Sequence, residues 1–308
     1  MSISSKTPVH LRAGSPAQLV ATLPYVFGFR PDQSVIVLGL KGRRIDAAAR
    51  LDASVVLNKF DAEVLRGRLE TVTGQGRQVI VVAWHDDTDA AKRAIEAVVD
   101  AIGTPDMTVI VSGGRCQADG GGWQECPDGV AEADEAGLPV LGSRGAVEAR
   151  AAGPSGPEAA AAAEAWASTS ESVEAMTLDE RRRRAKCLMK EGLAAPEDLT
   201  IEECLELASL ARQGRVRDVM TAGLTDEAAR SHLALWAAVV PKVPDEGAPA
   251  VLGLMGLAAW LAGDGALQVC CVERGLALEP EHSLLRLVDT INVMGVHPRE
   301  WAKVRRLR

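Results

Sequence analysis

Residues 258–301 constrain the fold of this chain more than any other stretch, because they read as two amphipathic helices joined by a short turn. Apolar residues recur three and four positions apart on both sides of Glu-Pro-Glu-His, residues 279–282. A Gly-Asp-Gly turn at 263–265 leads into the first of the two helices. Helices joined by so short a turn pack as antiparallel neighbours. We therefore predict a helical hairpin in this part of the chain.

Capping signals extend the helical prediction back to residue 177. Thr177 and Thr200 each precede a glutamate by three residues, which is the pattern of a capping box. A third helix is predicted to begin at Thr225-Asp-Glu-Ala, with an apolar face made of Leu233, Trp236, Ala237 and Val240. Further helices are predicted at 251–261, 266–278, 283–294 and 298 to about 304. Residues 177–308 are thus expected to form an all-α domain of helical hairpins.

The first half of the chain alternates between strand and helix patterns, which is typical of an α/β layer. Strands are predicted at 33–40, 45–51, 78–84 and 107–112, and a tight turn at 41–44 makes the first two a hairpin. Helices are predicted after Ser15, from Asn58 to about Val72, and from Asp86 to Ile102. We expect residues 1–150 to form a mixed α/β domain with a mixed sheet. Residues 151–176, rich in Ala, Pro, Gly and Ser, are predicted to be a linker or a helix.

Two smaller elements are predicted after the last long strand. The glycine-rich residues 113–122 are expected to join that strand to a short one around residues 123–125, which makes a second hairpin. A small strand at 140–141 and a helix capped by Ser143 are predicted to follow.

The charge balance excludes some classes of partner. The chain has 34 Lys and Arg against 42 Asp and Glu, a net charge of −8. Residues 1–150 carry 16 basic and 19 acidic side chains and residues 151–308 carry 18 and 23, so neither half attracts nucleic acid through its overall charge. An aromatic content of 3% also argues against binding of single strands by base stacking.

The apolar segments of the sequence bear on the cellular location of the protein. We find no signal peptide and no apolar run near the roughly 20 residues that a membrane span needs. We therefore expect a cytoplasmic protein with no membrane partner. In that reducing compartment the six cysteines are expected to be mostly buried thiols.

His85, Asp86 and Asp87 follow a predicted strand and begin a predicted helix. Ligands of open α/β sheets bind outside the carboxyl ends of the strands. These three residues are therefore candidate catalytic residues or ligands of a divalent cation. The structural alternative is that the acids cap the helix and interact with its dipole, and we favour that alternative.

Cys116 and Cys126 lie ten residues apart across the second predicted hairpin. With His85 they are candidate metal ligands, and by themselves they could form a labile disulfide. A structural zinc site takes four ligands and the chain has no CxxC motif, so we favour plain thiols. The nearby glycines match no phosphate-binding motif, and we expect them to form a flexible turn.

Four consecutive arginines concentrate positive charge on one predicted helix: Arg181, Arg182, Arg183 and Arg184. They are candidate contacts to a phosphate backbone. Consecutive residues point to all sides of a helix, however, so a solvated helix is the interpretation that we favour.

Polar residues at the junctions between predicted helices are candidates for recognition of a partner. Arg217, Asp264 and Arg274 would line a groove between helical hairpins. The structural alternative, which we favour for Arg217 and Asp264, is that they tie the turns together by bonding free helix ends.

Two resemblances extend this interpretation. Residues 258–282 resemble a tetratricopeptide repeat, with small residues at packing positions and Ala-Leu-Glu-Pro-Glu closing the second helix. Nearly the whole chain is similar to the actinobacterial domain-of-unknown-function family 4192. The motifs that carry this similarity are LPY at 23–25, GFRP at 28–31, SVIVLGL at 34–40, VAW at 82–84, RVRD at 215–218, AWL at 259–261, GDGA at 263–266 and PREW at 298–301.

The family resemblance implies a two-part protein and no known enzymatic activity. One feature departs from the family pattern, because the Trp- and Cys-rich hairpin is reduced here to Cys116, Trp123 and Cys126-Pro-Asp-Gly.

No motif of a serine hydrolase, zinc protease or kinase is present. We favour a non-enzymatic binding or scaffold protein that engages a protein partner through a helical groove and needs no cofactor. One alternative is a nucleotide- or metal-responsive regulator or hydrolase with its site at the carboxyl edge of the sheet. A nucleic-acid accessory protein is the other alternative, and homo-oligomerisation stays open.

Overall fold

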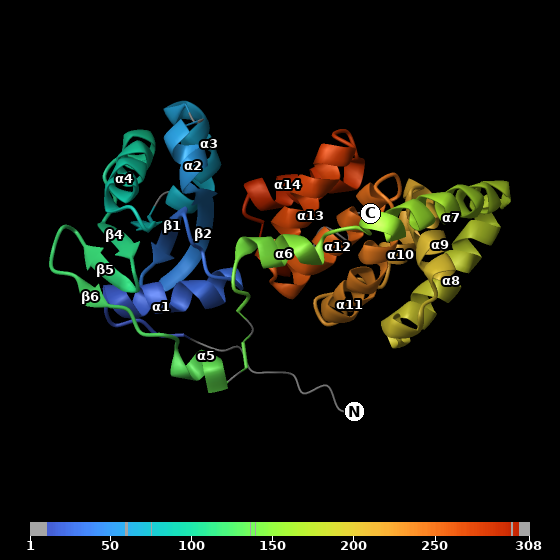
Figure 1. The fold of residues 1–308 in the computed structure, drawn as a ribbon, viewed down its shortest axis with the longest axis horizontal. Coiled ribbons are helices and arrows are strands. Elements are labelled where there is room, and N and C mark those ends of the chain that lie inside the picture. The colour runs from blue at the N-terminus through green and yellow to red at the C-terminus, as the bar shows by residue number, and fades with distance from the viewer. Residues whose placement is uncertain are drawn as a thin grey trace. The chain divides into compact units, whose positions relative to one another are not determined.

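The computed structural model describes residues 11–58, 61–74, 76–135, 137–138, 140–296 and 298–301. The chain divides into two compact units, Met1–Arg144 and Gly145–Arg308. The first unit contains a sheet covered by helices, and the second is built of helices (Figure 1).

The first unit holds a mixed sheet with the strand order β2-β1-β3-β4-β5-β6. Its strands are β1 (Ser34–Lys41), β2 (Arg44–Asp52), β3 (Gln78–Trp84), β4 (Met107–Ser112), β5 (Arg115–Ala118) and β6 (Gln124–Glu125). β3 and β4 are parallel, and the other neighbouring pairs are antiparallel. The prediction of a mixed α/β fold is confirmed. The bounds of β3 and β4 coincide with the predicted ones, because strands buried on both faces read as continuous apolar runs.

Helices cover both faces of this sheet (Figure 1). α1 (Pro16–Phe27) packs on one face, where its Leu19 and Leu23 share a core cluster with Ile36 and Val82. α2 (Ala53–Asn58), α3 (Ala62–Thr73) and α4 (Thr88–Ile102) pack on the opposite face. α4 connects the parallel strands β3 and β4, which need such a crossover. α5 (Ala131–Glu135) and α6 (Arg144–Arg150) follow the sheet in the chain.

Two helix starts in this unit differ from the prediction. Asn58 is the last residue of α2 and does not cap a helix that continues to Val72. Asp61 caps α3 instead, because its carboxylate accepts the backbone N–H of Glu63 at 3.0 Å. α4 begins at Thr88, two residues later than predicted, since Asp87 occupies the N-cap.

The second predicted hairpin is made of more strands than expected. The chain turns directly after β4 at Gly113 and Gly114, whose φ angles of 55° and 75° favour glycine. It forms β5 there and then pairs β6 with β5. The small strand predicted at 140–141 is reduced to a parallel bridge between Leu141 and Phe29.

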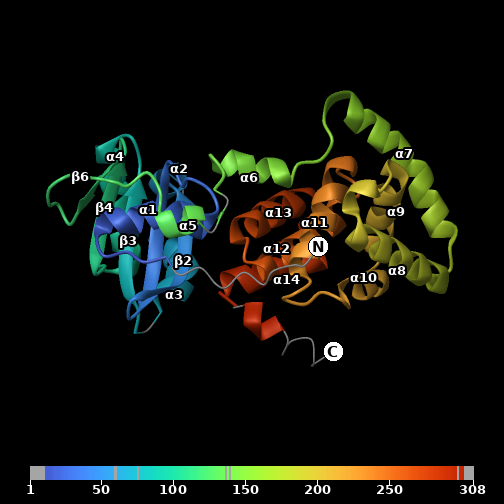
Figure 2. The same ribbon diagram turned by 90° about the horizontal axis from the view of Figure 1, so that it is seen from below.

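The second unit continues with eight α-helices among the described residues (Figure 2). They are α7 (Gly156–Ala175), α8 (Leu178–Ala194), α9 (Ile201–Ala211), α10 (Gly214–Thr221), α11 (Ala229–Val239), α12 (Ala248–Ala262), α13 (Gly265–Leu278) and α14 (Ser283–Val293). The alanine-rich segment offered as linker or helix is the long helix α7, as the helix propensity of alanine favours. The capping boxes at Thr177 and Thr200 are confirmed.

Two details of the helical prediction need correction. The buried face of α11 is His232, Leu235, Trp236 and Val239, whereas Leu233 and Ala237 are half-buried. The helix begins at Ala229 rather than near Thr225, and Val240 belongs to a 3-10 turn, Val240–Lys242. The last predicted helix is a 3-10 turn over Pro298–Glu300. Its remainder, up to about residue 304, lies mostly outside the described residues.

Close packing in the last three α-helices depends on small residues. A β-carbon on Gly275 of α13 would lie 2.5 Å from the side chain of Leu285 in α14. Gly253 and Gly256 of α12 similarly face Leu284 and the β-carbon of Cys271. α12 is therefore buried along nearly its whole length between its neighbours. Within the described residues, no helix has both the length and the apolar character needed to span a bilayer.

Candidate functional site

The structure places His85, Asp86 and Asp87 at the carboxyl end of β3, as predicted. Asp87 is the N-cap of α4, and its Oδ1 accepts the backbone N–H groups of Asp89 and Ala90 at 2.9 and 3.2 Å. These two hydrogen bonds lower the pKa of the Asp87 carboxyl. Nδ1 of His85 accepts the backbone N–H of Asp87 at 2.9 Å. His85 and Asp87 thus take part in capping the helix.

Sequence reasoning missed two residues beside Asp86. Gln33 has a φ of 49°, a left-handed conformation, and its Nε2 donates to Oδ2 of Asp86 at 3.0 Å. Burial raises the pKa of the Asp32 carboxyl, and the nearby charge of Asp86 raises it further. The signal was available, because β1 runs antiparallel to β3 and therefore begins at the edge where β3 ends.

Cys116 and Cys126 are brought together at the β5–β6 edge. Cys116 pairs with Gln124, and Cys126 follows on the same face two residues later. Burial and a hydrogen bond with Cys116 raise the pKa of Cys126 to about 12, so its thiol is a poor nucleophile and metal ligand. Both cysteines are free thiols. Within the described parts of the chain, no group of three or more His, Cys, Asp and Glu side chains is arranged to hold a metal ion.

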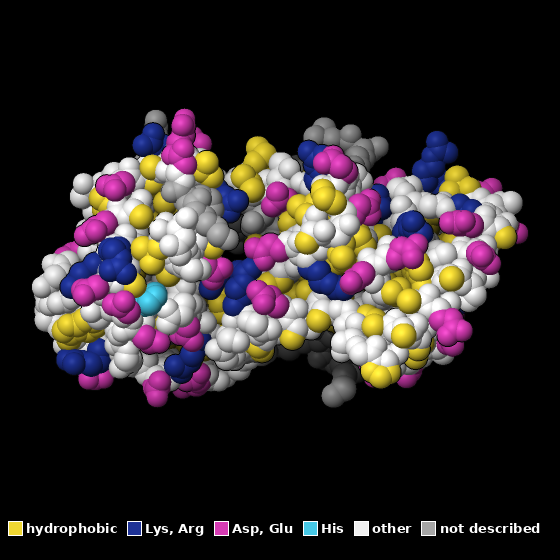
Figure 3. Space-filling view, turned by 45° about the horizontal axis from the view of Figure 1, so that its top comes forward, with side chains coloured by type: hydrophobic (Ala, Val, Ile, Leu, Met, Phe, Trp, Pro, Cys, Tyr) yellow, Lys and Arg dark blue, Asp and Glu magenta, His cyan; other side chains and the backbone are white. Residues whose placement is uncertain are grey.

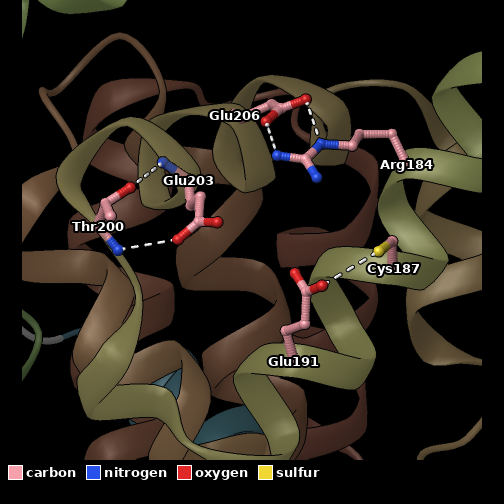
Figure 4. Close-up of polar contacts among 6 residues, drawn as sticks. All are labelled: Arg184, Cys187, Glu191, Thr200, Glu203 and Glu206. Atoms are coloured by element: carbon pink, nitrogen blue, oxygen red, sulfur yellow. Dashed lines mark hydrogen bonds and ion pairs between the residues drawn. The ribbon is translucent and has the colours of Figure 1, made fainter.

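The four arginines of α8 have different partners, and Figure 4 shows that of Arg184. Arg184 makes a bidentate ion pair with Glu206 of α9, with both N–O distances at 2.8 Å. Arg181 donates to the carbonyl oxygens of Val173 and Glu174 at the end of α7. Arg182 lies 3.9 Å from Asp179, and Arg183 is exposed. On the face drawn in Figure 3, basic and acidic side chains are interspersed.

Figure 4 also shows how two further polar pairs hold this region together. Thr200 and Glu203 exchange the two hydrogen bonds of their capping box, at 3.0 and 3.2 Å. Sγ of the exposed Cys187 donates to Glu191 at 3.3 Å. The acids of this region are thus engaged in local structure.

Arg217, the first predicted groove residue, ties three segments together. Its Nη1 donates to the carbonyl oxygens of Ala211 and Arg212, both at 3.2 Å, and lies 3.1 Å from Nε2 of His282. Its Nη2 donates to Oγ of Ser283 at 3.2 Å. Burial lowers the pKa of this guanidinium. Arg217 therefore links the α9–α10 junction to the start of α14.

Asp264 and Arg274, the other two predicted groove residues, also bond within the chain. Asp264 caps α13 by accepting the N–H of Leu267 and pairs with Arg150 at 2.7 Å. Arg274 donates to the carbonyl oxygen of Ala151 and pairs with Asp245, both at 2.6 Å. The two lie ten residues apart on α13, about 15 Å along its axis. The three residues therefore do not converge on one point.

A polar pocket lies where four helix ends of the second unit meet. Its volume is about 180 Å³, and its lining residues are Arg212, Glu246, Gly247, Pro249, Ala250, Glu279 and His282. Arg212 ends α9, Glu246 to Ala250 begin α12, Glu279 ends α13 and His282 caps α14. The turn singled out in the sequence thus supplies two lining residues. Arg212 and Glu246 carried no signal in the sequence.

His282 forms a buried wall of this pocket. Its side chain is 6% exposed, and its Nδ1 accepts the N–H of Leu285 at 3.4 Å. Burial and the charge of Arg217 lower the pKa of the imidazole, so that it is neutral near pH 7. The formal charges that line the pocket are therefore one guanidinium and two carboxylates.

Comparison with known proteins gives one match. The model of a family described as a domain of unknown function, DUF4192, matches residues 16–299. No curated protein and no solved structure matches the chain.

Proposed function

This chain belongs to the DUF4192 family, whose description assigns no activity, and we propose from the geometry that it is a binding protein. Its helical unit engages a protein partner by seating one partner side chain in the pocket between α9, α12, α13 and α14. The observation that carries this proposal is the pocket itself, a polar cavity among helix ends.

The size of the pocket favours a side chain over a cofactor. Sites for drug-sized ligands and cofactors have volumes of roughly 300–1,000 Å³. The pocket has a volume of about 180 Å³, which is below this range. That space suits the end of one long side chain and is too small for a nucleotide.

The packing of the last helices supports a role in binding. We propose that α12, α13 and α14 pair as tetratricopeptide-like hairpins, supported by the close contacts of Gly253, Gly256 and Gly275. Helical-hairpin arrays form concave surfaces that bind peptides and proteins. The free cysteines of the described residues are compatible with the cytoplasm as the proposed location.

In this proposal Arg217, Asp264 and Arg274 act on the partner indirectly. Arg217 donates to Oγ of Ser283, the residue after His282, and its Nη1 lies 3.1 Å from Nε2 of His282, which forms one wall of the pocket. Arg274 holds Asp245, the neighbour of Glu246 in the chain. Asp264 fixes the start of α13. They keep the helix ends that form the surface in place.

The test is a quantitative co-purification from the organism that makes the protein. Tagged wild-type chain is compared with the double variant Glu246→Lys, Glu279→Lys by mass spectrometry of the proteins retained. The control, Glu171→Lys with Glu202→Lys, changes the same charge at exposed positions of the same unit. We expect at least one protein that the wild type and the control retain equally and the pocket variant loses. An identical set of retained proteins for all three chains would remove the proposal.

A further inference from the structure

The pocket contains two carboxylates that the chain leaves unpaired. Within the part of the chain that the structure describes, neither Glu246 nor Glu279 has a hydrogen bond or an ion pair through its side chain. Other acids of the same unit are paired, for example Glu206 with Arg184, Asp264 with Arg150 and Asp245 with Arg274. Both unpaired carboxylates of this small cavity are thus available to a ligand.

We propose that the pocket binds a cationic side chain, that of lysine or arginine, whose charge is placed between Glu246 and Glu279. This inference rests on the proposed function and names the chemistry of the partner residue.

The positive charges near the pocket are already engaged. The guanidinium of Arg212 lies over the indole ring of Trp166, with Cζ 5.9 Å from the ring centroid, a cation–π arrangement. Arg217 does not line the pocket. Its guanidinium donates to two carbonyl oxygens and to Ser283, and the charge of Glu279 acts on it without a direct hydrogen bond. An anionic ligand would have to compete for these groups while facing two free carboxylates.

The dipoles of the helix ends that line the pocket do not favour one sign of ligand charge over the other. The pocket is lined by the C-terminal ends of α9 and α13, which favour cations, and by the N-terminal ends of α12 and α14, which favour anions. Two ends of each kind offset one another. The side-chain charges therefore decide the sign of the ligand, and they sum to −1 with His282 neutral.

The uncharged part of the lining suits the stem of a long basic side chain. Gly247, Pro249 and Ala250 present backbone and small apolar groups at the start of α12. Lys and Arg bury their methylene stems on such surfaces while their charged ends reach polar groups. Gly247 cannot carry a larger side chain, because a β-carbon there would lie 2.5 Å from Cη2 of Trp166. The packing of Trp166 thus keeps this wall of the pocket short.

The net charge of the surrounding sequence also favours a cationic ligand. Residues 151–308 carry 18 basic and 23 acidic side chains, a net charge of −5. A basic partner is therefore attracted over a distance of about one Debye length, some 8 Å at physiological ionic strength. This attraction predicts that binding weakens as salt is added.

The experiment is an NMR titration of the full chain with four probes that differ only in side chain. The probes are the Nα-acetylated amides of arginine, lysine, glutamine and glutamate, and the readout is the backbone amide signals of Ala250 and His282. We expect the arginine and lysine probes to shift these signals in a saturable way, and the other two to leave them unchanged. Equal shifts with the glutamine or glutamate probe, or no shift with any probe, would overturn the proposal.

Matched variants make the assignment specific. Glu279→Gln is expected to weaken binding of the arginine probe about five- to tenfold, and Glu171→Gln, an exposed acid of α7, to leave it unchanged. Unchanged binding in Glu279→Gln with Glu246→Gln would contradict the site. This titration needs no partner protein. Binding of the basic probes without a co-purified partner would therefore reject the proposed function and keep the pocket chemistry. A co-purified partner without binding of the basic probes would reject only the proposal that the pocket takes a cationic side chain.

Discussion

The edge of the sheet and the pocket of the helical unit are both lined by polar residues, but their polar groups are occupied differently. At the sheet edge Asp87 caps α4, His85 accepts a backbone N–H, and Asp86 accepts from Gln33. At the pocket Glu246 and Glu279 have no such partners within the described residues. Of the acids that follow the strand, Asp87 is therefore explained by helix capping and Asp86 by its hydrogen bond with Gln33. The groups available to a ligand lie where four helix ends meet.

The largest effect is expected when a polar side chain that holds helices together by hydrogen bonds is removed. Arg217→Ala is expected to lower the free energy of unfolding by about 2 kcal/mol, because it strips hydrogen bonds from a half-buried charged group. Urea unfolding of the two chains measures the effect. Arg215→Ala, an exposed arginine two residues earlier, serves as the control and is expected to change little. Equal stability of Arg217→Ala and Arg215→Ala would show that Arg217 is not a structural tie.

A pH titration of stability tests the buried histidines of the helical unit. Burial lowers the pKa values of both His232 and His282 in the folded chain. The unfolded chain therefore binds more protons below about pH 6.5, and stability falls as the pH drops from there toward the lowered values. Each histidine contributes at most about 1.4 kcal/mol per pH unit in that window.

The measurement is thermal unfolding at pH 7.5 and pH 5.5. We expect a lower Tm at pH 5.5 and a smaller difference between the two pH values in His232→Gln. His85→Gln changes a histidine of the sheet unit and is the matched control. A Tm that is independent of pH in this range would contradict the neutral, buried state of the two histidines.

Substitution of Asp87 tests whether the sheet edge is held by capping. Asp87→Ala is expected to destabilise the protein less than Arg217→Ala, and Asp87→Asn less still, because asparagine also caps helices. Hydrogen exchange of the amides of Asp89 and Ala90 measures the effect where it arises, and should be faster in Asp87→Ala. Unchanged exchange at both amides would leave the carboxylate free for a chemical role.

The smallest expected change in stability belongs to the pocket. Glu279→Gln is expected to alter the free energy of unfolding by less than about 0.5 kcal/mol, because this exposed carboxylate has no hydrogen bond or ion pair among the described residues and acts on Arg217 only through its charge. Urea unfolding checks this value beside the binding titration of the same variant. A clear loss of stability in Glu279→Gln would indicate a structural role for the residue.

Much of the fold follows from local signals. The apolar runs of β3 and β4 and the capping boxes at Thr177 and Thr200 depend on residues close together in the chain. The start of α3 was missed because Asn58 and Asp61 are both good caps, and only packing decides between them. The face of α11 was misplaced because apolar residues occur on several sides of this helix and a histidine, His232, is among its buried residues.

The candidate site was less predictable, for a physical reason. Glu279 and His282 belong to a turn that the sequence marks clearly, but Arg212 and Glu246 are exposed residues at the ends of other helices. Arg212 and Glu246 converge because α9 and α12 pack against the last hairpin. No pattern within a short stretch of sequence predicts that packing. Arg217 was recognised as a polar junction residue, yet its partners His282 and Ser283 lie 65 and 66 residues away.

The central claim, that the pocket and not the sheet edge meets the partner, is tested most directly by crosslinking in the living cell. A photoreactive benzoyl-phenylalanine is placed at Leu278, which is 38% exposed and adjoins Glu279, or at the exposed Asp86 of the sheet edge. The account predicts a crosslinked protein from position 278, lost when Glu246 and Glu279 are changed to lysine, and none from position 86. A crosslinked protein from position 86 and none from position 278 would contradict it.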